Sequence, residues 1–251
     1  MSEHQLQQQY ATDANLRARI VLHQRFSTAK EDWHRWLFDR VAPPPGARFL
    51  EVGCGPAEFW KQNLDRIDPS WHLELTDRST GMIEAAREVL GDRAKYAVAD
   101  VQELPFADES FDVCLASHML YHVEDRPKAF AEIRRVLVPG GALHAATNGY
   151  GHLDELLALY ADELFPHHAG LFGLETGPPQ LEPFFSQIEV DRLDGELRVT
   201  EVEPVLAYIR SSFVYDGGPL DAAVAPVGGA IEREGAFRIA TRAGVISCRK
   251  P

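Results

Sequence analysis

The segment from Arg48 to Ala57 constrains the fold of this chain more than any other. It reads Arg-Phe-Leu-Glu-Val-Gly-Cys-Gly-Pro-Ala, a short apolar run that ends in an acid and then in two glycines one residue apart. This pattern is typical of a buried parallel strand that turns sharply beneath a nucleotide-like ligand. The glycines permit a positive φ and let the backbone approach the ligand without a Cβ in between.

Two further strand-like runs end in acids. Residues 71–76 lead into Asp77, and residues 94–99 lead into Asp100. A carboxylate at the end of the second strand can accept hydrogen bonds from a ribose diol. Open α/β sheets bind ligands at the carboxyl ends of their strands, so the three segments predict one shared crevice.

The glycine spacing separates two kinds of nucleotide site. A dinucleotide fingerprint has a third glycine at position 58, but this chain has Glu58 there, and an acid would repel a pyrophosphate. The spacing therefore favours an adenosine without phosphates. An NAD(P)-dependent oxidoreductase is the disfavoured alternative, both because of Glu58 and because the sequence offers no plausible Tyr-Lys pair.

An ordered set of motifs resembles the class I S-adenosylmethionine-dependent methyltransferases. Their first motif, E/D-x-G-x-G-x-G, is matched by Glu51-Val-Gly53-Cys-Gly55-Pro-Ala57, in which Ala57 replaces the third glycine. The resemblance covers roughly residues 48 to 147. Its further motifs are Val98-Ala-Asp-Val101, Leu104-Pro-Phe106, Ser110-Phe-Asp-Val113 and Val136-Leu-Val-Pro-Gly-Gly141.

This resemblance implies an S-adenosyl-L-methionine cofactor and assigns roles to single residues. Asp77 would hold the ribose hydroxyls, and Asp100 would read the adenine amino group. The segment from Ser117 to His122 would close the floor of the pocket. The full set of expected cofactor-binding residues is Glu51, Gly53, Gly55, Asp77, Arg78, Met82, Asp100, Val101, Gln102, Ser117 and His122.

Two histidines after the fourth strand are the candidate catalytic residues. His118 and His122 are four residues apart, so they would share a face if the segment were helical. The resemblance places this segment under the methionine and sulfonium, where either ring could act as a base of near-neutral pKa. The alternative is that both rings only build the pocket wall. The glutamate of an H-E-x-x-H motif is missing, so we expect no metal.

The acceptor would lie between the N-terminal helices and the insert after the fifth strand. Asn148 follows the fifth strand, where it could bind a polar group of the acceptor or cap the helix that follows it. The helical spacing of Trp33 and Trp36 favours a position in the core. The adjacent His167 and His168 are expected to be solvated. The candidate substrate contacts are Tyr10, His23, Asn148 and His152.

The alternation of segments predicts an α/β fold, a doubly wound and mostly parallel seven-stranded Rossmann-like sheet. Residues 1–45 would form an N-terminal helical cap and residues 46–251 the cofactor-binding domain, with an insert at about 150–185 in the substrate region. Local signals predict an N-cap at Thr28 and a hairpin-like turn at Asp194-Gly195. The expected strands of the nucleotide-binding part are 48–52, 71–76, 94–99, 111–116 and 141–147, and the expected helices nearby are 57–66, 79–90, 126–137 and 152–164.

Composition limits the partners and the location. The 251 residues carry a formal net charge of −13, which argues against nucleic acid and against an anionic membrane surface. The three cysteines are scattered and suggest neither a disulfide framework nor a zinc site. No leader-like segment and no long apolar run is visible, so we expect a cytoplasmic protein. The expected partner is a small molecule, and the assembly state is left open, with a homodimer as one option.

The motifs together predict in-line methyl transfer from S-adenosylmethionine to a small-molecule acceptor. The alternative is a methyltransferase-like protein that binds the cofactor, or regulates through it, without turnover. The acceptor atom stays open among oxygen, nitrogen, sulfur and carbon, because this fold carries many chemistries.

Overall fold

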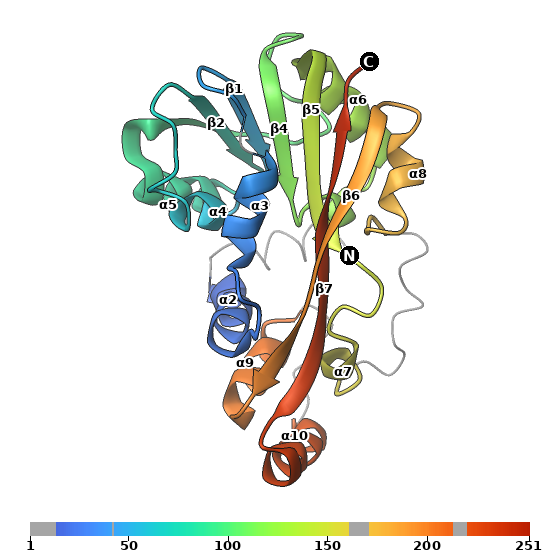
Figure 1. Ribbon diagram of the computed structural model, residues 1–251. Helices are drawn as coiled ribbons and strands as arrows, with labels where there is room; N and C mark the ends of the chain where they lie inside the picture. Colours follow the sequence, from blue (N-terminus) through green and yellow to red (C-terminus); the bar gives the residue numbers. More distant parts are fainter. Residues whose placement is uncertain (1–13, 42, 161–170, 213–219) are drawn as a thin grey trace.

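The computed structural model describes residues 14–41, 43–160, 171–212 and 220–251, which form a seven-stranded sheet with helices on both faces (Figure 1). The strands are β1 Arg48–Val52, β2 His72–Asp77, β3 Ala94–Val98, β4 Phe111–Ser117, β5 Leu137–Asn148, β6 Ser186–Val199 and β7 Phe237–Arg249. The α-helices are α2 Ala14–Phe26, α3 Trp33–Val41, α4 Glu58–Lys61, α5 Thr80–Leu90, α6 Arg126–Val136, α7 Asp154–Leu157, α8 Gly177–Leu181, α9 Val202–Arg210 and α10 Asp221–Glu234. Two short 3₁₀ helices are η1 Gly91–Arg93 and η2 Leu120–His122.

The order of the strands places their carboxyl ends at one edge. The order is β3-β2-β1-β4-β5-β7-β6, with β3 to β5 parallel and β7 antiparallel to both of its neighbours. Val52, near the end of β1, lies opposite Thr76 of β2 and Ala116 of β4. The strand order reverses between β1 and β4, which is where sheets of this class bind ligands. The doubly wound, mostly parallel sheet that the sequence predicts is confirmed.

Alternating side chains of the strands fill two separate cores. Phe49 of β1 packs on the face covered by α3, α4 and α5, and its neighbour Leu50 packs on the face covered by α6 and α8. This follows from the period of two in a strand. Glu51 follows Leu50 and therefore points into the same core as Phe49, where Trp60 of α4 also lies.

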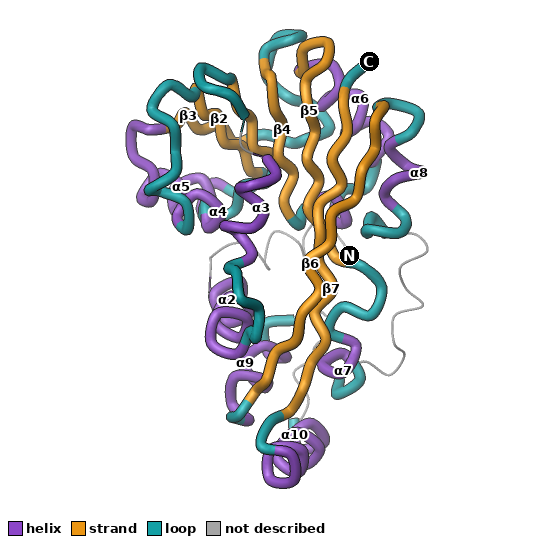
Figure 2. The backbone as a smooth tube through the Cα atoms, viewed as in Figure 1, coloured by secondary structure: helices purple, strands orange, loops and turns teal. Residues whose placement is uncertain are grey.

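Strands β6 and β7 continue past the end of β5. The last pair of β5 with β7 is Asn148 with Ala243, whereas β6 and β7 stay paired as far as Val199 with Phe237. We call residues 194–199 and 237–242 the β6–β7 ribbon. Figure 2 shows it extending well beyond the other strands, with α2, α7, α9 and α10 gathered around it. These elements share a third core.

The predicted turn at Asp194-Gly195 is wrong, because both residues lie inside the ribbon. Asp194 pairs with Arg242, and Gly195 pairs with Thr241. A Cβ on Gly195 would lie 3.0 Å from Thr241 Oγ1. The glycine therefore serves close packing between two strands and not a reversal of the chain.

The predicted N-cap at Thr28 is also wrong. Asp32 caps α3 instead, since its Oδ1 accepts the backbone N–H groups of His34 at 2.8 Å and Arg35 at 3.1 Å. The backbone N–H and the hydroxyl of Thr28 both bond to the carbonyl oxygen of Glu196 on the ribbon. Thr28, which lies between α2 and α3, thus joins the N-terminal segment to β6.

The helix after β5 is shorter than the predicted 152–164. Within the described residues it covers only Asp154–Leu157. Leu153 has a left-handed φ of 61°, and its N–H donates to the carbonyl of Ala240 at 2.9 Å, so the chain is held against β7 until that point. Residues 161–164 of the predicted helix lie outside the described residues.

Other local predictions have mixed outcomes. The helix expected at 57–66 ends at Lys61. At the start of α5, Ser79 Oγ accepts the N–H of Met82, and in the first turn of α6 lies Pro127. The three cysteines are free and buried, as expected of small apolar side chains.

No helix in the described ranges has the length and apolar character needed to cross a bilayer.

Candidate active site

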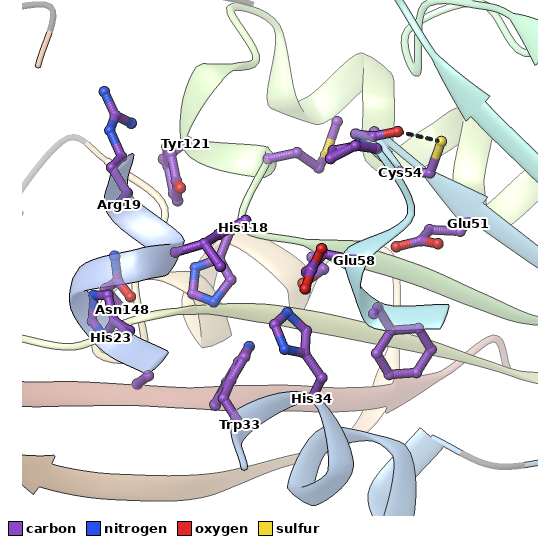
Figure 3. Close-up of a pocket in the computed structure, with 18 of the residues that line it drawn as sticks. Arg19, His23, Trp33, His34, Glu51, Cys54, Glu58, His118, Tyr121 and Asn148 are labelled. Atoms are coloured by element: carbon purple, nitrogen blue, oxygen red, sulfur yellow. Dashed lines mark hydrogen bonds between the residues drawn. The ribbon is translucent and has the colours of Figure 1, made fainter. Parts of the chain in front are cut away.

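A cavity of about 910 Å³ opens at the carboxyl edge of the sheet. Its floor comes from the loops after β1, β2, β3 and β4, and its opposite wall comes from α2, α3, α9 and the start of the ribbon. Figure 3 shows part of this lining. Every expected cofactor, catalytic and substrate residue that the structure describes lines this cavity. Tyr10 lies outside the described residues, as do His167 and His168.

The turn after β1 has the backbone that a closely approaching ligand needs. Gly53 and Gly55 adopt φ values of 66° and 54°. A Cβ on Gly53 would lie 2.8 Å from Met119 Cγ, so a side chain there would need Met119 to move. Ala57 keeps the left-handed backbone of the glycine it replaces, with φ 58°, and its methyl group is fully buried. Compared with glycine, Ala57 has less backbone freedom at this positive φ, but its methyl group adds a buried contact.

Glu51 lies beneath this turn and is 2% exposed. The indole Nε1–H of Trp60 donates to Glu51 Oε2 at 2.5 Å. Burial raises the pKa of Glu51 to about 8, against the opposite effect of the Trp60 hydrogen bond. Sequence reasoning missed Trp60, although its position in the helix after the glycine turn was a usable signal.

Asp77 joins the first two loops of the site. Its Oδ2 accepts the N–H of Gly55 at 2.9 Å, and its Oδ1 accepts the N–H of Ser79 at 2.8 Å. Burial raises the pKa of Asp77, and these backbone hydrogen bonds act in the opposite direction. The carboxylate thus fixes the glycine turn relative to the start of α5.

Asp100 connects the ends of β2 and β3. Its Oδ1 accepts the backbone N–H of Gln102 at 2.9 Å, and the Gln102 amide donates to both carboxylate oxygens at 3.1 Å. Arg78 Nε lies 3.6 Å from Asp100 Oδ2. Gln102 also accepts the N–H of Asp125, so this cluster is held to the start of α6.

The segment that carries His118 and His122 is not a helix, so the condition under which the two rings would share a face is not met. His118 has a left-handed φ of 52°, and only residues 120–122 form a 3₁₀ turn. The N–H of His118 bonds to the carbonyl of Ala146 on β5, which turns the chain away from a helix. Burial lowers the pKa of each imidazole to about 4, below the near-neutral value that we expected of a base.

The far side of the cavity brings together residues distant in sequence. The rings of His23 and His152 are stacked 6.1 Å apart, and His152 Nδ1 accepts the N–H of Arg242 at 3.0 Å. Burial lowers the pKa of His23 to about 4. Asn148 does not cap a helix through its Oδ1, which is buried without a hydrogen-bond partner among the described residues.

The first turn of α3 contributes residues that the sequence did not single out for this site. Trp33, expected in the core, lines the cavity and packs 5.3 Å from the ring of His118. In Figure 3 the imidazoles of His34 and His118 approach each other above Trp33. Only Trp36 of the predicted pair is fully in the core, at 4% exposure. The described residues contain no group of three or more metal-ligand side chains placed to hold an ion.

Residues 50–145 match a family model described as a methyltransferase domain. The chain is 32% identical over 133 residues to the ubiquinone/menaquinone biosynthesis C-methyltransferase UbiE of Vibrio campbellii, covering 51% of each chain. It is 34% identical over 116 residues to the UbiE of Vibrio parahaemolyticus, covering 44% of this chain and 45% of that one. The chain therefore aligns with about half the length of the curated relatives it matches.

Solved structures share the fold at lower identity. Haemonchus contortus phosphoethanolamine N-methyltransferase 2, in complex with phosphomonomethylethanolamine and S-adenosylhomocysteine, has a TM-score of 0.62 and 22% identity, covering 98% of this chain and 59% of that chain. The [4+2]-cyclase SpnF has a TM-score of 0.59 and 18% identity, covering 98% and 96%. These likenesses support the architecture alone. Residues 50–145, which match the methyltransferase domain, run from β1 into β5 and include the loops that form the floor of the cavity.

Proposed function

We propose that the protein transfers a methyl group from S-adenosylmethionine to a small-molecule acceptor. The observation that carries the proposal is the convergence of Gly53, Asp77 and Asp100 on one cavity. They end or follow three different strands, and the parallel sheet brings them together although they are far apart in the sequence. The neighbours named above support a small acceptor, because the UbiE relatives are named for quinone biosynthesis and the Haemonchus enzyme holds a small phosphorylated amine.

The residues present fit this cofactor. Gly53 and Gly55 line the cavity with their backbone alone, so no side chain of this turn stands between the backbone and a ligand. Asp77 and Asp100 each present a carboxylate to the cavity, as a ribose diol and an adenine amino group require.

The proposed roles follow from the positions of the residues. Glu51, Gly53, Gly55 and Ser117 would shape the methionine end, with His122 above them. Asp77, Arg78 and Met82 would surround the ribose, and Asp100, Val101 and Gln102 would surround the adenine. His23, Asn148 and His152 would contact the acceptor, together with Tyr10. We also propose that residues 1–45 act as a cap on residues 46–251, and that the insert at about 150–185 borders the substrate.

The chemistry supplied by the bound cofactor is an electrophilic methyl group, which an acceptor lone pair takes in line as the carbon–sulfur bond breaks and its electron pair stays on sulfur. The residues of the chain orient the acceptor and exclude water. At neutral pH the rings of His118 and His122 are uncharged, because their pKa values are lowered to about 4. Each ring then accepts a hydrogen bond more readily than it stores a proton. Orientation and desolvation therefore contribute more than base catalysis by these two rings.

Calorimetry with S-adenosylhomocysteine tests the cofactor site. Asp77→Ala removes both backbone hydrogen bonds and the ribose ligand, so we expect binding at least roughly tenfold weaker, equal to about 1.4 kcal/mol. Asp65→Asn is the matched control, since Asp65 is a surface carboxylate paired with Arg35 away from the cavity. Circular dichroism melts show whether the variant is folded, and Asp100→Asn gives a second variant. No binding by the unsubstituted protein, or equal binding by Asp77→Ala, contradicts the proposal.

The alternative function, cofactor binding without turnover, is separated by product analysis. Tight S-adenosylhomocysteine binding with no methylated product across a broad acceptor panel would favour it. The structural likeness to SpnF, which is named a cyclase, shows that this fold also occurs in a protein named for another reaction. We propose that the protein acts in the cytoplasm. We also propose that its substrate is not a nucleic acid, in line with the net charge of −13. Light scattering on the purified protein decides between a monomer and a homodimer.

A further inference from the structure

We infer that the acceptor is a basic amine, recognised as a cation, and not a phosphorylated or carboxylated molecule. This inference rests on the proposed function and adds the substrate class. It concerns the part of the cavity lined by α2, the first turn of α3, the loop after β4 and the start of the ribbon, which we call the acceptor compartment. The residues that carry the argument are His23, Asp32, Trp33, His118, Asn148 and Asp194.

Asp32 gives the compartment a fixed negative charge. Its Oδ1 caps α3, and its Oδ2 has no hydrogen bond within the described part of the chain. The neighbouring His34 lowers the pKa of Asp32, so the carboxylate is ionised at neutral pH. Its side chain is 40% exposed, which leaves it accessible to a ligand. Asp194 and Glu31 add two further carboxylates to the same lining.

The arginines that line the cavity are held by other groups of the protein. Arg19 and Arg78 are the lining arginines of the described residues, which include no lining lysine. Arg19 is engaged by Ser211, whose carbonyl accepts from Nη2 at 2.7 Å, and it lies over the ring of Tyr208. Figure 3 shows the Arg19 guanidinium directed away from His118. Arg78 lies beside Asp100 in the cofactor half. A phosphate or carboxylate would therefore meet Glu31, Asp32 and Asp194. The imidazole of His34, 3.7 Å from Asp32, and the guanidinium of Arg242, 3.9 Å from Asp194, already lie beside two of these carboxylates.

The uncharged groups of the compartment accept hydrogen bonds and suit a cation. Burial keeps His23 and His118 neutral at pH 7, so they do not repel a positive charge. Neither ring nitrogen of His118 has a hydrogen-bond partner among the described residues. Asn148 Oδ1 is likewise unpartnered, and an arriving N–H group would relieve the cost of that unmade bond. The indole of Trp33 also lines the compartment, stacked on Trp36 and 5.3 Å from the ring of His118, and indole is the aromatic group that attracts cations most strongly.

The chemistry of methyl transfer agrees with an amine. Transfer to a hydroxyl oxygen or to carbon needs a base that removes a proton from the acceptor. The two histidines nearest the glycine turn are poor bases at neutral pH, because their pKa values are lowered to about 4. An amine that releases its proton to water already carries the attacking lone pair as its free base. The methylated product keeps its remaining protons as an ammonium ion, so one proton leaves in all, it goes to water before the transfer, and no residue has to hold it.

Matched probes test the inference by binding, without turnover. Protein saturated with S-adenosylhomocysteine is titrated calorimetrically at pH 7 with 2-phenylethylamine, 2-phenylethanol and 3-phenylpropanoate, which share a ring and differ in charge. We expect the amine to bind at least roughly tenfold more tightly than the alcohol, and the carboxylate to bind most weakly. A carboxylate that binds as tightly as the amine overturns the inference. So does the failure of all three probes to bind.

Asp32→Asn identifies the source of the selectivity. Asn is also a good N-cap, so the variant keeps α3 and loses only the charge. We expect it to weaken amine binding by roughly threefold to tenfold and to leave alcohol binding unchanged. Asp65→Asn, the surface control, should change neither. Equal weakening of both probes by Asp32→Asn contradicts charge recognition. Since the cofactor product is titrated first, loss of that step would instead contradict the proposed function.

Discussion

Glu51 is a carboxyl residue whose pKa the fold raises by burial. Its carboxyl lies in the core under the glycine turn, bonded to the Trp60 indole at 2.5 Å, and burial raises its pKa to about 8. The unfolded chain has the ordinary value of 4.5. Between these two values the folded protein holds a proton that the unfolded chain has released. The free energy of unfolding therefore falls as the pH rises from about 4.5 to about 8.

Glu51→Gln removes this pH dependence. The Gln side chain can still accept the Trp60 N–H, but it carries no titratable proton. We expect little change in stability near pH 5 and a growing advantage of the variant as the pH rises to 8. The two unfolding curves should diverge by up to about 1.4 kcal/mol per pH unit over that window. Urea titrations at several pH values measure it, and parallel pH profiles would show that Glu51 is ionised in the folded protein.

The β6–β7 ribbon is the element that gives the cavity its far wall. It extends the main sheet into the third core, where Leu197 and Ile239 pack against Leu22 of α2 and Val205 of α9. Thr28 binds Glu196 on the same ribbon. The position of the N-terminal helix α2 over the cavity therefore depends on the ribbon and not on the strands that form the glycine turn.

Leu197→Ala tests this dependence. Leu197 is fully buried, so its truncation should cost about 2–5 kcal/mol through lost contacts and a cavity. Because the third core is separate from the two sheet cores, we expect faster amide hydrogen exchange in α2, α9 and α10, with β1 and β4 little changed. Leu75→Ala, at an equally buried position of the main sheet, is the control and should affect β1 and β2. The same exchange pattern in both variants would argue against a separate third core.

At the scale of the whole molecule, buried histidines make the fold sensitive to acid. Burial lowers the pKa of four imidazoles, those of His23, His118, His122 and His144, to about 4. The unfolded chain takes up these protons near pH 6.5, whereas the folded protein resists them until about pH 4. Stability from this source is complete above pH 6.5 and is lost as the pH falls toward 4. Glu51 acts in the opposite direction over part of this window.

His144→Asn isolates one of these protons away from the cavity. His144 lies on β5, is 9% exposed, and its Nδ1 lies 2.8 Å from Ser247 Oγ. Asn can keep that hydrogen bond but does not titrate. We expect the decline in unfolding free energy between pH 6.5 and 4 to become shallower by up to about 1.4 kcal/mol per pH unit. His72→Asn, at an exposed position, controls for the substitution itself. An unchanged acid decline in His144→Asn would assign the effect to other groups.

The sequence predicted site residues best at the ends of the strands. Gly53, Asp77 and Asp100 each end or follow a predicted strand, so their meeting at one edge could be predicted from the parallel sheet alone. The 3₁₀ turn at His122 could not be predicted, because the hydrogen bond from His118 to Ala146 joins residues that are far apart in the sequence. Trp33 and Asp32 also escaped prediction as site residues. Their side of α3 faces the cavity only because the ribbon holds the preceding segment, and no periodicity in the sequence records that contact.

The ribbon also limits how the length of the chain can vary. Along β6, alternate residues face the third core and the solvent, and Leu197 and Val199 are both fully buried on the inner side. Deleting one residue beyond Leu193 would turn this alternation over and bring polar side chains inward. Insertions and deletions in the ribbon should therefore survive only in pairs. Homologous chains that reshape this wall for other acceptors would have to do so in steps of two residues or by exchanging side chains at constant length.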